Sequence, residues 1–164
     1  MPNCPICETV DCKESNSGKP DAVRFDCKRC GEFDLTGTVL AVLPNALAGG
    51  VHRRALMSHV IRQMKGLDAS PRPLIVSDKL ESYWPTDRLP PPSAQADRLI
   101  LLSGDKQLSP EDPIRFAAYF LDAWVGASLT TPGNPHAGVE WLLRHLMDEK
   151  LLNWQVDSAD DGWK

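Results

Sequence analysis

Two pairs of cysteines constrain the fold of this chain more than any other feature. The first pair is Cys4 and Cys7, the second is Cys27 and Cys30, and nineteen residues separate the pairs. A C-x2-C pair forms a tight turn, or knuckle, that presents two thiolates to one metal ion, and two knuckles complete a tetrahedron. We therefore expect one structural Zn²⁺ per chain, bound by these four thiolates, with no open ligand position for a substrate.

The fifth cysteine, Cys12, lies in the segment between the two pairs. Disulfides would require secretion and an even count, whereas the N-terminus lacks the basic, apolar and small-residue order of a signal peptide. Metal-bound thiolates in a reducing cytoplasm fit the pattern better. For Cys12 we expect a semi-buried or exposed thiol, with a substitute ligand or redox sensor as the alternative.

Composition and charge exclude two broad classes of protein. The chain has 164 residues, 42% hydrophobic and 24% charged, with a formal net charge of -4. No apolar run approaches the length that spans a bilayer, so we expect no membrane contact. Residues 1–67 hold nine Lys and Arg against seven Asp and Glu, whereas residues 68–164 hold nine against fifteen. A strongly basic nucleic-acid-binding protein is excluded, and any such binding must come from a local face.

The residue pattern predicts a mostly α fold with a small β zinc ribbon at the N-terminus. Val23, Phe25 and Cys27 alternate with less apolar residues and predict a strand, and Phe33 and Leu35 predict the returning strand. We divide the chain into four parts: residues 1–35 as the zinc ribbon, 36–67 as a basic helical segment packed on it, 68–93 as a proline-rich connector with a short helix, and 94–164 as a helical, winged-helix-like domain.

Helical periodicity and stop signals locate the expected helices. We expect a short helix over 38–43 that Pro44 interrupts, a strong helix over 51–65 that ends at Gly66, and a brief helix after Asp78. In the last part, helices over 93–103, 114–125 and 139–149 and then a strand over 151–156 give the element order of a winged helix.

The helix over 51–65 carries a basic face in a segment, 36–67, that has no Asp or Glu. One interpretation is phosphate contact by Arg53, Arg54, Arg62 and Lys65. The other is a solvated helix face paired with acidic residues of the C-terminal half. For the two histidines of this helix, His52 and His59, we expect a surface or packing role.

The expected recognition helix over 136–149 argues for protein contact rather than DNA contact. Acidic side chains on or beside it outnumber basic ones, which is unfavourable in a groove lined by phosphates. The acidic residues are Glu140, Asp148 and Glu149, and the basic residues are Arg144 and Lys150. No phosphate-binding loop, H-E-x-x-H segment or nucleophile elbow occurs, so we expect no enzymatic activity.

Several short segments follow one another in a recurring order: Cys27 to Gly31, Ser58 to Arg62, Pro90 to Pro92, Gln95 to Ile100, Val139 to Leu152, and Gly162 with Trp163. This order of motifs resembles an N-terminal region found in many bacterial proteins, which often precedes an effector domain similar to TIR or nucleoside deoxyribosyltransferase folds. The resemblance implies a sensing or adaptor role in anti-phage defence, with an effector encoded nearby as a partner. Two departures are Glu8, where a glycine is common, and Lys164, where the chain stops and an effector would begin.

From these observations we expect a cytoplasmic, non-enzymatic, zinc-stabilised regulatory, sensor or adaptor protein that acts through protein–protein contacts. The alternative is a regulator that binds DNA or RNA through the basic helix and the winged-helix-like unit.

Overall fold

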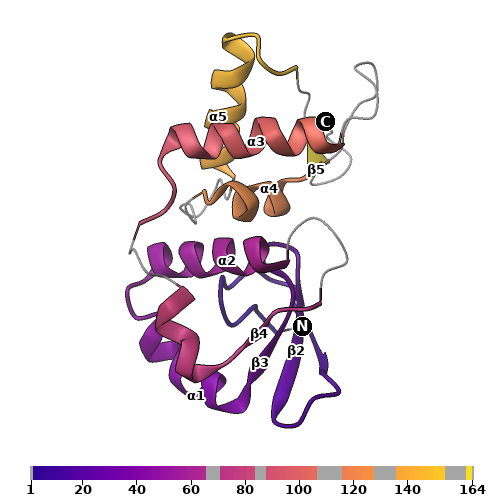
Figure 1. The fold of residues 1–164 in the computed structure, drawn as a ribbon, viewed down its shortest axis with the longest axis vertical. Helices are drawn as coiled ribbons and strands as arrows, with labels where there is room; N and C mark the ends of the chain where they lie inside the picture. The colour runs from indigo at the N-terminus through magenta and orange to yellow at the C-terminus, as the bar shows by residue number, and fades with distance from the viewer. Residues whose placement is uncertain are drawn as a thin grey trace.

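The computed structural model describes residues 2–65, 71–83, 88–106, 116–127, 136–153 and 162–163. A four-stranded sheet with its helices forms one part, made of residues up to 83 and called here the sheet unit (Figure 1). The helices from residue 92 onward form the second part, called here the helical unit. Helix α2 of the sheet unit runs along the junction and faces α4 of the helical unit (Figure 1).

The sheet has the strand order β1-β2-β3-β4. The first three strands are antiparallel, and the fourth is parallel to β3. Phe25 and Phe33 are direct partners across β2 and β3, and their rings stack with centroids 5.6 Å apart. This pair confirms the strand and its return that the alternating pattern predicted. The strands are Lys13–Asn16 (β1), Ala22–Cys27 (β2), Gly31–Thr36 (β3) and Leu74–Ile75 (β4).

Two helices follow β3 in the sequence, before the fourth strand. Helix α1 spans Gly37–Ala46 and α2 spans Val51–Lys65, as the periodicity predicted for α2. The prediction that Pro44 interrupts the first helix is wrong, because the helix continues past it to Ala46. Burial of Leu43 and Leu47 on the core side of this last turn outweighs the one hydrogen bond that a proline removes.

The segment expected to be a connector contributes to the core of the sheet unit. Strand β4 pairs with β3, and the side chain of Ile75 is fully buried. The expected short helix after Asp78 is a 3₁₀ helix, η1, over Ser77–Tyr83, and it buries Leu80. The sheet unit therefore extends to residue 83 rather than ending near residue 67.

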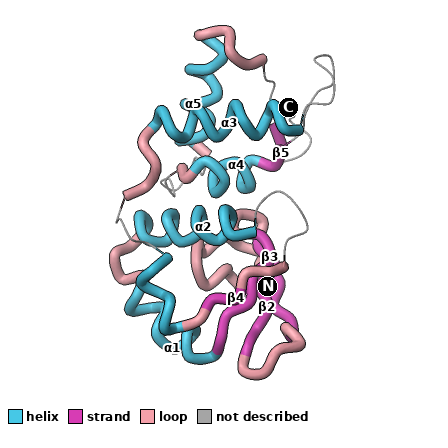
Figure 2. Tube along the Cα trace, viewed as in Figure 1, coloured by secondary structure: helices cyan, strands magenta, loops and turns pink. Residues whose placement is uncertain are grey.

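Among its described residues, the helical unit has three helices and one pair of short strands. Figure 2 shows the helices α3, α4 and α5 with strand β5 beside them. The prediction of a single helix over 114–125 is wrong at its first described residues. Phe116 and Ala117 form a strand that pairs with the distant Gly162 and Trp163. Periodicity in a short window cannot reveal such a non-local pairing. The elements are α3 (Pro92–Lys106), β5 (Phe116–Ala117), α4 (Ala118–Val125), α5 (Ala137–Asp148) and β6 (Gly162–Trp163).

Several predictions concern residues outside the described ranges. They are the helix stop at Gly66 and most of the strand over 151–156, whose described residues, 151–153, do not form a strand. Helix α3 also runs past its expected end at residue 103 to Lys106. Within the described part of the chain, no helix has the length and apolar character needed to cross a membrane.

Candidate metal centre and its contacts with the helical unit

Four cysteine sulfurs converge between the two knuckles. The Sγ atoms of Cys4, Cys7, Cys27 and Cys30 all lie within 4.8 Å of one another, and all four residues are buried. Two of the Sγ–Sγ distances are 3.9 Å (Cys4 to Cys30) and 3.6 Å (Cys7 to Cys27). Four ligands about 2.3 Å from a tetrahedral ion are about 3.8 Å apart, so these distances fit a bound metal. None of these cysteines forms a disulfide.

Without a metal ion, the four buried sulfurs differ in how readily each holds a proton. Burial raises the pKa of the Cys30 thiol, whereas a hydrogen bond from Cys27 lowers the pKa of Cys7. Several thiolates packed together repel one another unless a cation lies between them. A divalent metal ion satisfies this set of sulfurs, because it replaces their protons and balances their charge.

Each knuckle is followed by a residue in the left-handed conformation. Glu8 has φ of 61° and Gly31 has φ of 81°. The turn of the first knuckle closes with a hydrogen bond from the Glu8 N–H to the Cys4 carbonyl at 2.9 Å. In the second knuckle, the Cys30 N–H donates to the Cys27 sulfur at 3.4 Å. The two knuckles thus share a backbone design although the first lacks the glycine.

Two hydroxyl groups lie beside the sulfurs. Thr9 Oγ1 is 3.1 Å from Cys7 Sγ, and Ser58 Oγ is 3.3 Å from Cys30 Sγ. Hydroxyls in this position stabilise metal-bound thiolates by donating hydrogen bonds to them. Sequence reasoning did not assign Ser58 to this site; the available signal was its spacing of four residues from Arg54 and from Arg62, which places the three side chains on one face of the helix.

Cys12 is buried at 1% exposure, which corrects the expectation of a semi-buried or exposed thiol. Its backbone N–H donates to the Pro2 carbonyl at 3.2 Å, and this contact draws the inter-knuckle segment onto the metal centre. A hydrogen bond with Cys12 raises the pKa of Cys4, so the two thiols are neighbours. Cys12 nevertheless stands outside the group of four convergent sulfurs.

Helix α2 contributes one arginine to each knuckle. The Arg54 guanidinium donates to the Ile6 carbonyl at 3.0 Å in the first knuckle and pairs with Glu8, also at 3.0 Å. In the second knuckle, Arg62 donates to the carbonyls of Lys28 at 2.7 Å and Arg29 at 2.6 Å. These cations satisfy backbone oxygens and lie close to an anionic sulfur cluster, so they stabilise both turns.

The basic face predicted to contact phosphate is therefore used inside the fold at three positions. Arg53 donates to the Ala46 carbonyl at 3.1 Å, in the last turn of α1, while Arg54 and Arg62 bind the knuckles as above. The side chain of Lys65 lies outside what the structure describes. Phosphate contact by these four residues stays a prediction.

The second knuckle also reaches the helical unit through Arg29. This side chain is 1% exposed, donates to the Ala127 carbonyl at 2.8 Å and pairs with Asp122 at 3.3 Å. The same carboxylate accepts a hydrogen bond from His136 Nδ1 at 2.6 Å. Burial raises the pKa of Asp122, against the opposing effect of His136 and Arg29. The net direction indicates that forming this ion pair carries a desolvation cost.

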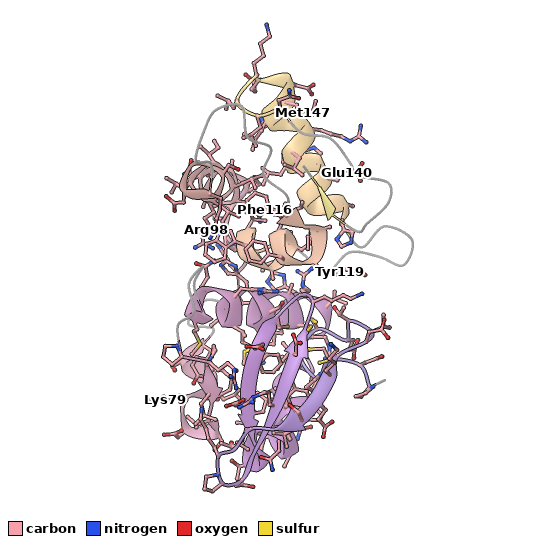
Figure 3. All side chains as sticks on the ribbon, turned by 90° about the vertical axis from the view of Figure 1, so that its right-hand side faces the viewer. Lys79, Arg98, Phe116, Tyr119, Glu140 and Met147 are labelled. Carbon is pink, nitrogen blue, oxygen red and sulfur yellow. The ribbon has the colours of Figure 1, made fainter. Side chains whose placement is uncertain are left out.

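A second polar contact with α4 comes from His59, which lies on α2. Its Nδ1–H donates to the Ala123 carbonyl at 2.7 Å. Because the Arg98 guanidinium of α3 can only donate, His59 Nε2 accepts from it and the ring is neutral. Burial lowers the pKa of His59 to about 4, and the nearby Arg98 and Arg29 charges act in the same direction. Figure 3 shows Arg98 and Tyr119 on the side of the helical unit that faces α2.

Helix α5 presents large apolar side chains to solvent. Trp141 is 58% exposed, Leu151 just beyond the helix is 60% exposed, and Met147 is also exposed. The Trp141 ring stacks on His145 with centroids 5.6 Å apart, and Arg144 pairs with Glu140 at 2.6 Å. Figure 3 shows Glu140 and Met147 on α5, beyond the α2–α4 junction.

Taken together, the fold and the site define a two-part, mostly helical protein whose small mixed sheet carries a four-cysteine metal-binding centre. Comparison with family models, curated proteins and solved structures yields no significant match.

Proposed function

We propose that this protein is a zinc-stabilised adaptor or sensor without enzymatic activity, and that it acts by binding a protein through the outer face of α5. Zn²⁺ is the metal of this proposal, because four thiolates at tetrahedral spacing suit Zn²⁺ and leave no open position for chemistry. The anti-phage context and a TIR-like or deoxyribosyltransferase-like effector as partner follow from the motif resemblance and belong to the same proposal.

The observation that carries the proposal is the exposed apolar set on and just beyond α5, formed by Trp141, Met147 and Leu151. Trp is the residue most enriched at energetic centres of protein interfaces, and Met is enriched at interfaces generally. The acidic residues on and beside this helix outnumber the basic ones, and the one arginine is paired with Glu140. This balance favours a protein partner over a phosphate backbone.

The element order of the helical unit supports a winged-helix-like interpretation. Strand β5 lies between α3 and α4 in the sequence and pairs antiparallel with β6, which follows α5. A winged helix has this helix, strand, helix, helix, strand order, with its third helix as the contact element. In that arrangement α5 is the helix that meets the partner.

Nucleic-acid binding by the same unit is the second candidate. The observation in its favour is the exposed stack of Trp141 on His145, because flat exposed rings provide platforms for bases. The use of Arg54 and Arg62 as partners of knuckle carbonyls counts against the basic face of α2 as the main phosphate contact.

The test begins with titrations of the zinc-loaded protein against short single- and double-stranded DNA and RNA at low and physiological salt. We expect no binding that weakens steeply with salt. Such binding, abolished by Trp141→Glu, would overturn the adaptor proposal in favour of the second candidate. Crosslinking in cells then compares Trp141→Glu with Val51→Glu, a matched change at a 60% exposed site on α2. We expect the proteins that crosslink to the wild type to be lost with Trp141→Glu and retained with Val51→Glu. Equal crosslinking by both variants would contradict an interface on α5.

A further inference from the structure

Polar contacts hold the two units together. Among the described residues, the buried apolar cluster of the sheet unit runs from Cys4 to Leu80, and that of the helical unit runs from Leu99 to Leu146, with no member in common. Each unit therefore has its own hydrophobic core. Junctions of this kind resemble transient interfaces more than a shared core, and relative motion of the two units is the default expectation unless specific contacts prevent it.

The carbonyl end of α4 receives its hydrogen-bond donors from the sheet unit. The last carbonyls of a helix have no partner within the helix and carry partial negative charge. His59 donates to the Ala123 carbonyl at 2.7 Å, and Gln63 donates to the Trp124 carbonyl at 2.9 Å. Both donors lie on α2, one turn apart, so α2 caps α4 across the junction.

Arg29 completes this cap from the second knuckle. It contacts the Ala127 carbonyl just past the end of α4 and the Asp122 carboxylate within it. Arg29 stands between the ligands Cys27 and Cys30, so the turn that aims its side chain is the turn that holds the metal. Arg62 binds the carbonyl of Arg29 and stacks over Phe120 of α4, 5.0 Å from its ring centroid, and so joins the same turn to the same helix.

The Arg29 contact is geometrically demanding. Among the residues that the structure describes, Arg29 Nε and Asp122 Oδ1 are buried and have no hydrogen-bond partner. A buried pair with unsatisfied atoms persists only where the surrounding structure holds it in position, and here the knuckle provides that constraint.

We infer that the second knuckle is a metal-dependent docking element: the metal-bound turn aims Arg29 at the carbonyl end of α4 and holds the helical unit against α2, and loss of the metal releases the helical unit. The inference does not depend on the proposed function, because it concerns contacts within one chain. It assigns to the metal centre a conformational role beyond the stability of the sheet unit, and it makes the junction sensitive to the availability of a thiophilic metal ion.

The test measures metal content, hydrogen exchange and small-angle scattering on the zinc-loaded full chain. Arg29→Met is compared with Arg144→Met, a matched change at an exposed arginine of α5. We expect Arg29→Met to keep one Zn²⁺ per chain and wild-type exchange in β2 and β3, while α4 exchanges about tenfold faster and the radius of gyration rises. Arg144→Met should match the wild type. A metal-loaded Arg29→Met with wild-type α4 exchange and radius of gyration overturns the inference.

If Arg29→Met binds the metal poorly, the Asp122→Asn variant provides the test instead, because Asp122 lies on α4, outside both knuckles. Full zinc content with a larger radius of gyration supports the docking element, and full zinc content with wild-type values overturns it. Chelator titration of the wild type gives an independent result. Exchange in α4 should rise in proportion to the zinc released, and α4 protection that survives complete zinc removal contradicts the inference.

Discussion

The guanidinium of Arg29, which stands between two cysteines of the metal centre, lies 3.3 Å from the carboxylate of Asp122 on α4, and both side chains are buried. The contact joins residues that belong to different units of the fold. A buried ion pair adds little net stability, because the Coulomb attraction only offsets the desolvation of both charges. Its effect is to specify one arrangement of the two units, since any other arrangement deprives Arg29 of its carboxylate partner.

Removing one partner of this pair should therefore cost more than removing both. We expect Arg29→Met to lower the free energy of unfolding by about 3 kcal/mol, and Arg29→Met with Asp122→Leu to recover part of that loss. Urea denaturation of the zinc-loaded variants measures both. The exposed Arg144–Glu140 pair is the control, and its disruption should cost about 0.5 kcal/mol. Additive effects of the two buried substitutions would show that the charges do not interact.

Position 31 of the second knuckle favours glycine for two reasons, its left-handed backbone and the Arg62 side chain beside it. Gly31 has φ of +81°, and a Cβ there would lie 2.6 Å from Arg62 Nη1. We expect Gly31→Ala to destabilise the protein by about 3 kcal/mol, from left-handed strain and displacement of Arg62. Gly18 is a matched control, since it has φ of +76° and open space around a Cβ, and Gly18→Ala should cost only about 1 kcal/mol. Equal losses for both variants in denaturant melts would argue against the Arg62 contact.

His59 makes the junction sensitive to acid. Its pKa is about 4 in the folded protein and 6.5 in the absence of this environment, so the unfolded chain binds the extra proton between these values. Stability is therefore complete above pH 6.5 and falls as the pH drops toward 4, by up to about 3 kcal/mol. Protonation would also put a charge on Nε2, which faces Arg98.

Stability against pH, measured for the wild type and His59→Gln, checks this prediction. Acid also protonates the cysteine thiolates and releases metal in both proteins, so the difference between the two curves isolates His59. We expect the two curves to diverge between pH 6.5 and 4, with the variant less sensitive. Parallel curves over that range would rule out titration of His59 as a cause of acid sensitivity. His145→Gln, a change on α5 far from the junction, should follow the wild type.

The four convergent cysteines and Cys12 should respond differently to substitution. We expect Cys27→Ser to lose the metal and unfold β2 and β3, because the small sheet depends on the metal for its stability. Cys12→Ser is the control and should keep one metal per chain, since Cys12 stands outside the convergent group. Elemental analysis and circular dichroism measure the two effects. A Cys27→Ser protein with full metal content and an unchanged spectrum would sink the assignment of that ligand.

The local features of the fold could be predicted from the sequence. The spacing of Cys4, Cys7, Cys27 and Cys30 predicted the convergent sulfurs, and helical periodicity predicted α2 from Val51 to Lys65. Both depend on neighbours a few residues away. The wrong predictions involve distant partners: the strand at Phe116 forms because Trp163 pairs with it, and the helix passes Pro44 because Leu43 and Leu47 are buried in the core.

The sequence by itself determined which residues can hold a metal and which segments are helical, because ligand chemistry and 3.6-residue periodicity are local properties. Only the tertiary structure decided what the charged residues do. Arg54 and Arg62 read as a basic surface in the sequence, yet they bind knuckle carbonyls, and Arg29 reaches Ala127, 98 residues away. The physical reason is that a charge removed from water takes whichever oxygen the folded chain brings within reach, and for Arg29 that oxygen lies in the other unit.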